Sequence, residues 1–133
     1  MKKILVAEDS ATNRELIRDI LEARGCEVVE AVDGEEALVK IRETQPDLVL
    51  MDVQMPRLGG VGALERLRRE PGLASTPVIA LTAYAMRGDR ERLLAVGFDG
   101  YLSKPIEART LWSQVETLFR GNGAAEVMQR LRS

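Results

Sequence analysis

The run that decides the fold is Leu48-Val49-Leu50-Met51-Asp52, and the turn dipeptide Met55-Pro56 follows it closely. Four consecutive apolar residues predict a strand that is buried on both faces, as in a parallel sheet. A carboxylate at the end of such a strand is costly to bury unless it pairs with another group. Asp52 is therefore the first candidate for a functional residue.

Other polar residues stand at equivalent places, each just after an apolar run. They are Glu8 and Asp9 after Ile4-Leu5-Val6-Ala7, Thr82 after Val78-Ile79-Ala80-Leu81, and Lys104 after Gly100-Tyr101-Leu102. Parallel strands bring their carboxyl ends to one edge of the sheet, where open α/β folds bind ligands. Three carboxylates, a hydroxyl and an ammonium in one crevice predict a site for a hard divalent cation and a phosphoryl group.

Amphipathic helices are expected between the strands. The first helix has Ser10 as its N-cap and Gly25 as its stop signal, and Asp33 with Glu36 caps the second. Apolar residues at helical spacing mark the inner faces of successive helices: Leu16, Ile17, Ile20 and Leu21; Ala37, Leu38 and Ile41; Val61, Leu64 and Leu67; and Leu111, Val115 and Leu118.

The remaining elements complete the alternation. A second strand is expected from Cys26 to Ala31, a fourth strand opens at Thr76-Pro77, a fourth helix runs roughly from Arg87 to Val96, and a short fifth strand covers Tyr101 and Leu102. Five βα units with apolar strands predict an α/β fold, in which helices cover both faces of a five-stranded, doubly wound parallel sheet.

Length and composition place the chain among single-domain globular proteins. It has 133 residues, of which 45% are hydrophobic and 30% charged, and its apolar runs are strand-sized, so no membrane span is expected. Met1-Lys2-Lys3 leads directly into a strand without a signal peptide, and we expect a cytoplasmic location. A net charge of -2 lacks the basic stripe of nucleic-acid binders.

The titratable residues that are missing also limit the chemistry. The chain has no histidine and a single cysteine, Cys26. These counts exclude an imidazole base, a phosphohistidine, an internal disulfide and a cysteine-histidine zinc site. If phosphoryl groups pass through this protein, it accepts or returns them and does not carry them on a histidine of its own.

Five motifs together resemble the receiver domain of two-component response regulators: Glu8-Asp9, Asp52, Met55-Pro56, Leu81-Thr82-Ala83 and Tyr101-Leu102-Ser103-Lys104-Pro105. The resemblance covers about residues 2–120, so we expect a receiver domain over 1–120 and a short tail over 121–133. It implies a flavodoxin-like (βα)5 fold with strand order 2-1-3-4-5.

The resemblance implies a role for each matching residue. Asp52 would be the phosphoacceptor. Glu8, Asp9, Asp52 and the main-chain carbonyl of Gln54 would hold Mg²⁺. Lys104 would neutralise one phosphoryl oxygen, and the Thr82 hydroxyl would donate a hydrogen bond to another.

Further residues are implied to control the switch. Thr82 and Tyr101 would carry the conformational change, and Gln54 and Tyr84 occupy positions that the family varies to tune hydrolysis of the acyl phosphate. One departure concerns Gly59, which stands where the family usually has an acidic residue. The third helix should therefore lack a side-chain cap, at a cost of a few tenths of a kcal/mol.

The resulting hypothesis is a stand-alone, single-domain receiver of the chemotaxis or cell-cycle regulator type. It would be a phosphorylation-activated signalling switch that is not an enzyme beyond catalysing its own phosphorylation and dephosphorylation. Its partners would be a histidine kinase or histidine phosphotransfer protein and a downstream protein. Alternatives are a receiver module excised from a hybrid histidine kinase, a Mg²⁺-dependent aspartyl phosphatase and an FMN carrier. The phosphatase would need a second aspartate at the position of Gln54, and Glu8-Asp9 would repel a flavin phosphate.

Each residue also has an ordinary structural explanation when it is considered alone. Acidic residues after a strand are often N-caps or solvated, Thr82 can end a strand, and Lys104 can be a surface charge. Tyr101 and Trp112 can simply pack against the core. The tail residues Val127, Met128 and Leu131 have helical spacing, which a packed or frayed extension explains equally well.

Overall fold

The computed structural model describes residues 2–83 and 88–119. Residues 108–119 are helical, and the other elements alternate along the chain as β1 (Lys3–Ala7), α1 (Ala11–Glu22), β2 (Glu27–Ala31), α2 (Gly34–Thr44), β3 (Leu48–Asp52), α3 (Gly60–Arg68), β4 (Val78–Thr82), α4 (Asp89–Val96) and β5 (Gly100–Ser103). All strand pairs are parallel, in the order β2-β1-β3-β4-β5. The predicted doubly wound α/β fold and its strand order are confirmed.

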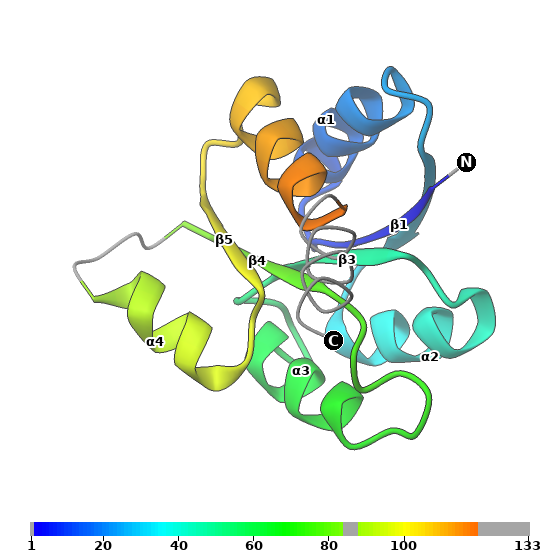
Figure 1. Ribbon diagram of the computed structural model, residues 1–133, viewed down its shortest axis with the longest axis vertical. Coiled ribbons are helices and arrows are strands. Elements are labelled where there is room, and N and C mark those ends of the chain that lie inside the picture. The colour runs from blue at the N-terminus through cyan, green and yellow to red at the C-terminus, as the bar shows by residue number, and fades with distance from the viewer. Residues whose placement is uncertain (1, 84–87, 120–133) are drawn as a thin grey trace, which may run out of the picture.

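The sheet separates two hydrophobic clusters, because successive side chains of a strand point to opposite faces. In Figure 1, α1 and the helix at residues 108–119 lie on one side of the sheet, and α2 and α3 lie on the other. One cluster joins α1 and residues 108–119 to Ile4, Val6, Leu48, Leu50, Ile79 and Leu81. The other joins α2, α3 and α4 to Leu5, Ala7, Val49, Met51, Val78 and Ala80. Apart from Lys3 at the start of β1 and the site residues Asp52 and Thr82 at the ends of β3 and β4, these three strands are apolar, because both of their faces are covered.

The predicted helix caps are present in the structure. The Ser10 hydroxyl accepts a hydrogen bond from the Asn13 N–H at 3.3 Å. The Asp33 carboxylate accepts from the Glu36 N–H at 2.8 Å, and Glu36 in turn accepts from the Val32 N–H at 3.1 Å. At α3, by contrast, the N-cap is Gly59, and within the described residues no side chain caps that helix.

The structure differs from the prediction in α1, and the predicted start of α4 cannot be compared. Leu16 is 44% exposed and not on the inner face of α1, since Ile17 and Leu21 already fill the stripe that faces the sheet. The α1 helix ends at Glu22, and Gly25 lies beyond it in a turn with φ of 82°. The α4 helix begins at Asp89, and the predicted start at Arg87 lies outside the described residues.

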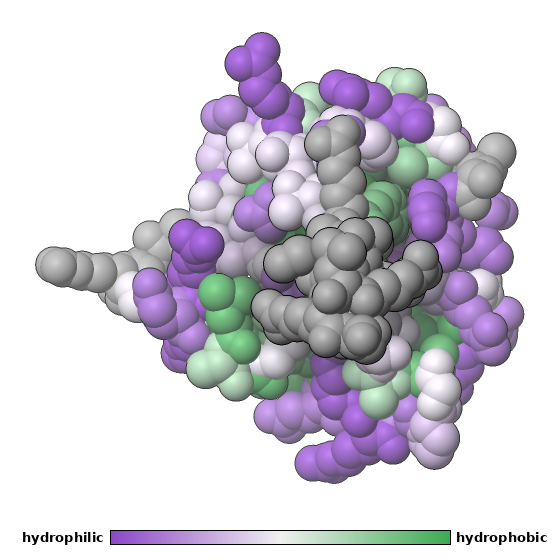
Figure 2. Space-filling model, viewed as in Figure 1, coloured by the Kyte–Doolittle hydropathy of each residue, from purple (hydrophilic) through white to green (hydrophobic). Residues whose placement is uncertain are grey.

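The surface is mixed in character. The face shown in Figure 2 is mainly hydrophilic, with hydrophobic residues in small separate areas. The large apolar side chains that are exposed in the described ranges are Leu16, Val39, Leu94 and Val96. Scattered apolar residues of this kind are ordinary on protein surfaces. Among the helices that the structure describes, none is long and apolar enough to cross a membrane.

Candidate functional site

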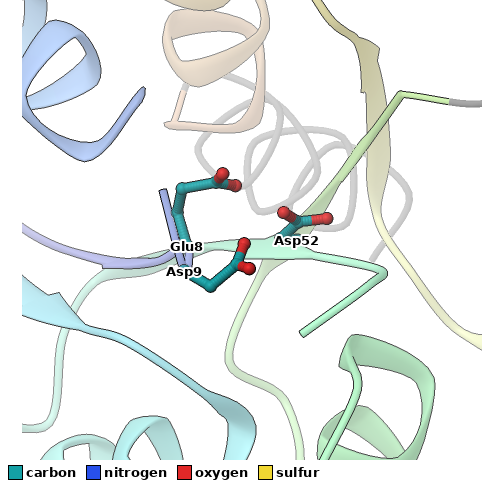
Figure 3. A group of neighbouring side chains, drawn as sticks. All are labelled: Glu8, Asp9 and Asp52. Carbon is teal, nitrogen blue, oxygen red and sulfur yellow. The ribbon is translucent and has the colours of Figure 1, made fainter. Parts of the chain in front are cut away.

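Three carboxylates meet at the carboxyl edge of the sheet. The β1 and β3 strands are parallel neighbours, with Ala7 opposite Met51, so the residues that follow them lie together. One oxygen from each of Glu8, Asp9 and Asp52 lies within 4.8 Å of the other two. Figure 3 shows the three side chains grouped at the strand ends. Glu8 and Asp52 are buried and Asp9 is exposed, so the group opens to solvent on the side of Asp9.

Lys104 lies between the two buried carboxylates. Its Nζ donates to Oδ2 of Asp52 at 2.7 Å and to Oε1 of Glu8 at 2.9 Å. The Lys104 backbone N–H donates to the Thr82 carbonyl at 2.8 Å, which holds the end of β5 against the end of β4. The peptide bond between Lys104 and Pro105 is cis. The position of Lys104 directly after β5 thus places its ammonium within the cluster of three carboxylates.

The charges in this site are not balanced by the protein alone. Burial and the neighbouring Asp52 raise the pKa of Glu8 from 4.5 to about 7. Burial lowers the pKa of Lys104, but the hydrogen bonds to Asp52 and Glu8 outweigh this effect and raise it above its ordinary value. Oε2 of Glu8 is buried and accepts no hydrogen bond from the described residues, although it lies 2.9 Å from the ammonium. A cation would satisfy this excess of negative charge.

The donor set fits Mg²⁺. This ion prefers oxygen ligands and is usually held by one or two carboxylates, together with waters and phosphoryl oxygens. The site offers carboxylate oxygens, one of them without a hydrogen bond, and an exposed side for water. The Gln54 N–H donates to Oδ1 of Asp52 at 3.0 Å, so the backbone of the β3–α3 loop lies at the same site.

Thr82 and Tyr101 occupy the two strands beyond Asp52. Thr82 ends β4 and is buried, and in the sheet it comes one residue after Leu81, which pairs with Asp52. Tyr101 in β5 is half-buried and packs against the cluster that contains α4. Its backbone exchanges two hydrogen bonds with the side chain of Gln114. The structure thus brings Thr82 to the site and places Tyr101 on the neighbouring strand, opposite Ala80 and two residues back from the strand ends. Tyr84 lies outside the described residues.

Two contributions were missed by sequence reasoning. Asn13, in the first turn of α1, donates from Nδ2 to Oε1 of Glu8 at 3.2 Å. Arg57, in the β3–α3 loop, pairs with Asp33, with 2.6 Å between Nη2 and Oδ2. Asn13 carries a weak signal, because it follows the acidic pair by about one helical turn. The pair of Arg57 with Asp33 leaves no signal in the sequence, since its two residues lie in loops far apart along the chain.

Comparison with known proteins agrees with this geometry. Residues 4–116 match the family model of the response regulator receiver domain. The chain belongs to this family. It is 44% identical over 105 residues to the polar-differentiation response regulator DivK of Brucella anthropi, which covers 79% of this chain and 85% of the relative. Receivers of this kind are phosphorylation-activated signalling switches in two-component systems, and this chain is one of them.

Solved structures of other receivers have the same fold. The Francisella response regulator 1452 receiver domain is 33% identical, with a TM-score of 0.85 over 92% of this chain and 99% of that one. The receiver domain of sensor histidine kinase PA1611 from Pseudomonas aeruginosa is also 33% identical, with a TM-score of 0.80 over 90% and 98%. That receiver has a magnesium ion coordinated in its active site cleft.

Proposed function

We propose that Asp52 accepts a phosphoryl group from a phosphohistidine donor, and that the phosphorylated form binds a downstream protein with changed affinity. The observation that carries this proposal is the ammonium of Lys104, 2.7 Å from the buried Asp52 carboxylate and beside two further carboxylates. An anionic nucleophile next to a fixed positive charge and a cation site suits phosphoryl transfer, which depends mainly on positioning and charge neutralisation.

The transfer itself needs one nucleophile. An oxygen of Asp52 attacks phosphorus, the bond from phosphorus to the donor's imidazole nitrogen breaks, and its electron pair stays on that nitrogen. Lys104 then shifts from the carboxylate to a phosphoryl oxygen, because the incoming group carries more negative charge. The Thr82 hydroxyl donates a hydrogen bond to another phosphoryl oxygen. The protein catalyses only its own phosphorylation and dephosphorylation, with Gln54 and Tyr84 tuning the latter.

The residues that would hold Mg²⁺ are Glu8, Asp9, Asp52 and the main-chain carbonyl of Gln54. Bound Mg²⁺ would neutralise phosphoryl oxygens and orient them for attack. The Asp9 carboxylate is the exposed member of the cluster and would keep the metal accessible to water. Glu8 and Asp52 supply the buried charge that favours a cation.

The signal would leave through β4, β5 and their neighbouring helices. Thr82 moves toward the phosphoryl group, and Tyr101 follows because it lies on the adjacent strand. The donor would be a histidine kinase or a histidine phosphotransfer protein. We place the receiver at residues 1–120 with a tail at 121–133, in the cytoplasm. Both a stand-alone regulator and a module of a hybrid kinase accord with the relatives described above.

The proposal is tested by intact mass after incubation with acetyl phosphate and Mg²⁺. Wild type should gain one phosphoryl group, and Asp52→Asn should gain none. Asp19→Asn, which changes an exposed aspartate of α1, is the matched control and should behave like wild type. Equal incorporation in wild type and Asp52→Asn would refute the assignment of the acceptor. An aspartyl phosphatase would in addition hydrolyse added phosphomonoesters, which this protein should not do.

A further inference from the structure

Arg57 has an unusual backbone conformation next to the site. Its φ is 66°, in the left-handed region that residues other than glycine seldom adopt. It stands in the β3–α3 loop, three residues after Gln54. A conformation of this kind persists only where surrounding contacts hold it, and it is often found near functional sites. In this conformation the Arg57 side chain forms an ion pair with Asp33.

The Arg57–Asp33 pair joins two loops that are separate in sequence. Nε and Nη2 of Arg57 lie 2.8 and 2.6 Å from Oδ2 of Asp33. The other oxygen, Oδ1, caps α2 by accepting from the Glu36 N–H. The Asp33 side chain is 5% exposed, whereas that of Arg57 is 67% exposed. Both oxygens of this buried carboxylate are therefore engaged. The hydrogen bond from the Glu36 N–H lowers the pKa of Asp33, and the contact with Arg57 lowers it further.

A second contact fixes the same loop to α2. The Gly34 N–H donates to the Leu58 carbonyl at 3.0 Å. A Cβ at Gly34 would lie 2.3 Å from that oxygen, so the approach of the two backbones requires glycine. The loop therefore rests against the start of α2 at Leu58 and is tied to it at Arg57.

The other end of the loop contacts the acceptor. The Gln54 N–H donates to Oδ1 of Asp52 at 3.0 Å, and the Gly60 N–H donates to the Val53 carbonyl at 3.0 Å. The loop from residue 53 to residue 60 is thus closed on itself, with the Asp52 carboxylate bonded at one end and the Asp33 anchor near its middle. A displacement of Arg57 would be transmitted over a few residues to Gln54.

We infer that the Arg57–Asp33 pair is a positioning device that holds the β3–α3 loop in the conformation required for tight Mg²⁺ binding by the carboxylate cluster. The inference rests on the proposed function. Arg57 touches neither metal nor phosphoryl group in this account and acts through Gln54 and Asp52. Residues around metal ligands that fix ligand orientation commonly change metal affinity by about 10-fold or more.

If Arg57 acted only through its charge, its removal would change the Mg²⁺ affinity in the opposite direction. Arg57 is a positive charge in a loop beside a cation site, so its removal would strengthen Mg²⁺ binding if charge were its only contribution. Screening by salt would also reduce that effect. The positioning account predicts weaker binding without Arg57, at low and at high salt. The direction of the change therefore separates the two explanations.

The test is Mg²⁺ titration by calorimetry, in parallel with amide exchange of the loop. Arg57→Ala should raise the Kd for Mg²⁺ about 10-fold and accelerate exchange at Gln54. Asp33→Asn keeps an N-cap residue for α2 but loses the charge, and it should weaken binding similarly. The double variant should be no worse than either single variant, since both remove the same contact.

Two further variants distinguish the positioning of the β3–α3 loop by Arg57 from a general change in the stability of the protein. Arg57→Gly removes the side chain while glycine accepts the left-handed conformation, so Mg²⁺ binding should weaken although the strain is relieved. Arg66→Ala breaks the exposed pair between Arg66 and Glu35 and should leave Kd unchanged. Unchanged or tighter Mg²⁺ binding in Arg57→Ala would overturn this inference and leave the proposed function standing. A wild type that binds no Mg²⁺ would refute the proposed function, and the inference with it.

Discussion

Nζ of Lys104 lies 2.7 Å from Oδ2 of Asp52, although Lys104 follows β5, Asp52 ends β3, and β4 lies between these two strands in the sheet. The lysine side chain thus reaches across the end of β4, where Thr82 stands. A contact of this kind orders three strand ends at once. It also means that an incoming phosphoryl group must compete with the Asp52 carboxylate for the same ammonium.

Removing the ammonium should destabilise the metal-free protein. In Lys104→Met, Glu8 and Asp52 remain buried beside each other without their cation, and we expect the free energy of unfolding at pH 8 to fall by about 1–3 kcal/mol. Urea unfolding measures this change. The control is Lys40→Met, which removes a more exposed pair with Glu36 and should cost less than about 1 kcal/mol. Equal losses in the two variants would contradict the account of the site.

The pH dependence of stability should reflect Glu8. Its pKa rises from 4.5 to about 7 on folding, so between these values the folded protein holds a proton that the unfolded chain has lost. The contribution of Glu8 to the free energy of unfolding is therefore complete below about pH 4.5 and is lost as the pH rises toward 7. One pKa unit is worth about 1.4 kcal/mol, so a rise from 4.5 to about 7 sets an upper bound of about 3.5 kcal/mol.

This dependence is measured by urea unfolding without metal at several pH values. Glu8→Gln cannot ionise and should flatten the decline between pH 5 and pH 7. Saturating Mg²⁺ should also oppose the decline, because the metal favours the ionised carboxylate. An identical slope in wild type and Glu8→Gln would show that Glu8 does not carry the effect.

Mg²⁺ should stabilise the protein through Asp9. At a concentration 100 times its Kd, a ligand that binds only the folded state adds about 2.7 kcal/mol to the free energy of unfolding. Asp9→Ala should lose most of this increase, and it should leave the metal-free protein as stable as wild type or more so, because one repelling charge is gone. Thermal or urea unfolding with and without Mg²⁺ tests both points. A full Mg²⁺ effect in Asp9→Ala would count against the cluster as the metal site.

Two glycines of α3 should respond differently to the same substitution. A Cβ at Gly60 would lie 2.4 Å from the backbone oxygen of Asp52, so Gly60→Ala should cost roughly 2–3 kcal/mol and disturb the acceptor strand. At Gly62 the nearest atom is the end of the flexible Leu58 side chain, at 2.8 Å. Alanine also favours the helix by about 1 kcal/mol there. Gly62→Ala should thus stay within about 1 kcal/mol of wild type, and a larger loss than in Gly60→Ala would be unexpected.

Much of the architecture could be predicted because local signals agree with the global fold. Ser10 and Asp33 mark helix starts by capping the following turns, and the uninterrupted apolar run before Asp52 marks a strand covered on both faces. Parallel pairing then brings Glu8, Asp52 and Lys104 to one edge. Leu16 shows the limit, since periodicity alone did not show which apolar residue of α1 would remain in solvent.

Contacts between loops could not be predicted in this way. The left-handed conformation of Arg57 and its pair with Asp33 depend on how two loops meet in space, and no residue spacing encodes that meeting. The direct bonds from Lys104 to Glu8 and Asp52 likewise depend on its reach across β4. The family resemblance implies a contact of Lys104 with the phosphoryl group only, and in the unphosphorylated structure Lys104 instead pairs with both buried carboxylates.

The central claim is that the cleft directs phosphorylation to Asp52 with the help of Mg²⁺. Peptide mapping by mass spectrometry after reaction with acetyl phosphate tests it most directly. The account predicts one phosphoryl group, located on Asp52, formed with Mg²⁺ and nearly absent when EDTA removes the metal. Phosphorylation at Glu8, Asp9 or a residue outside the cleft, or incorporation at Asp52 that is indifferent to EDTA, would contradict it.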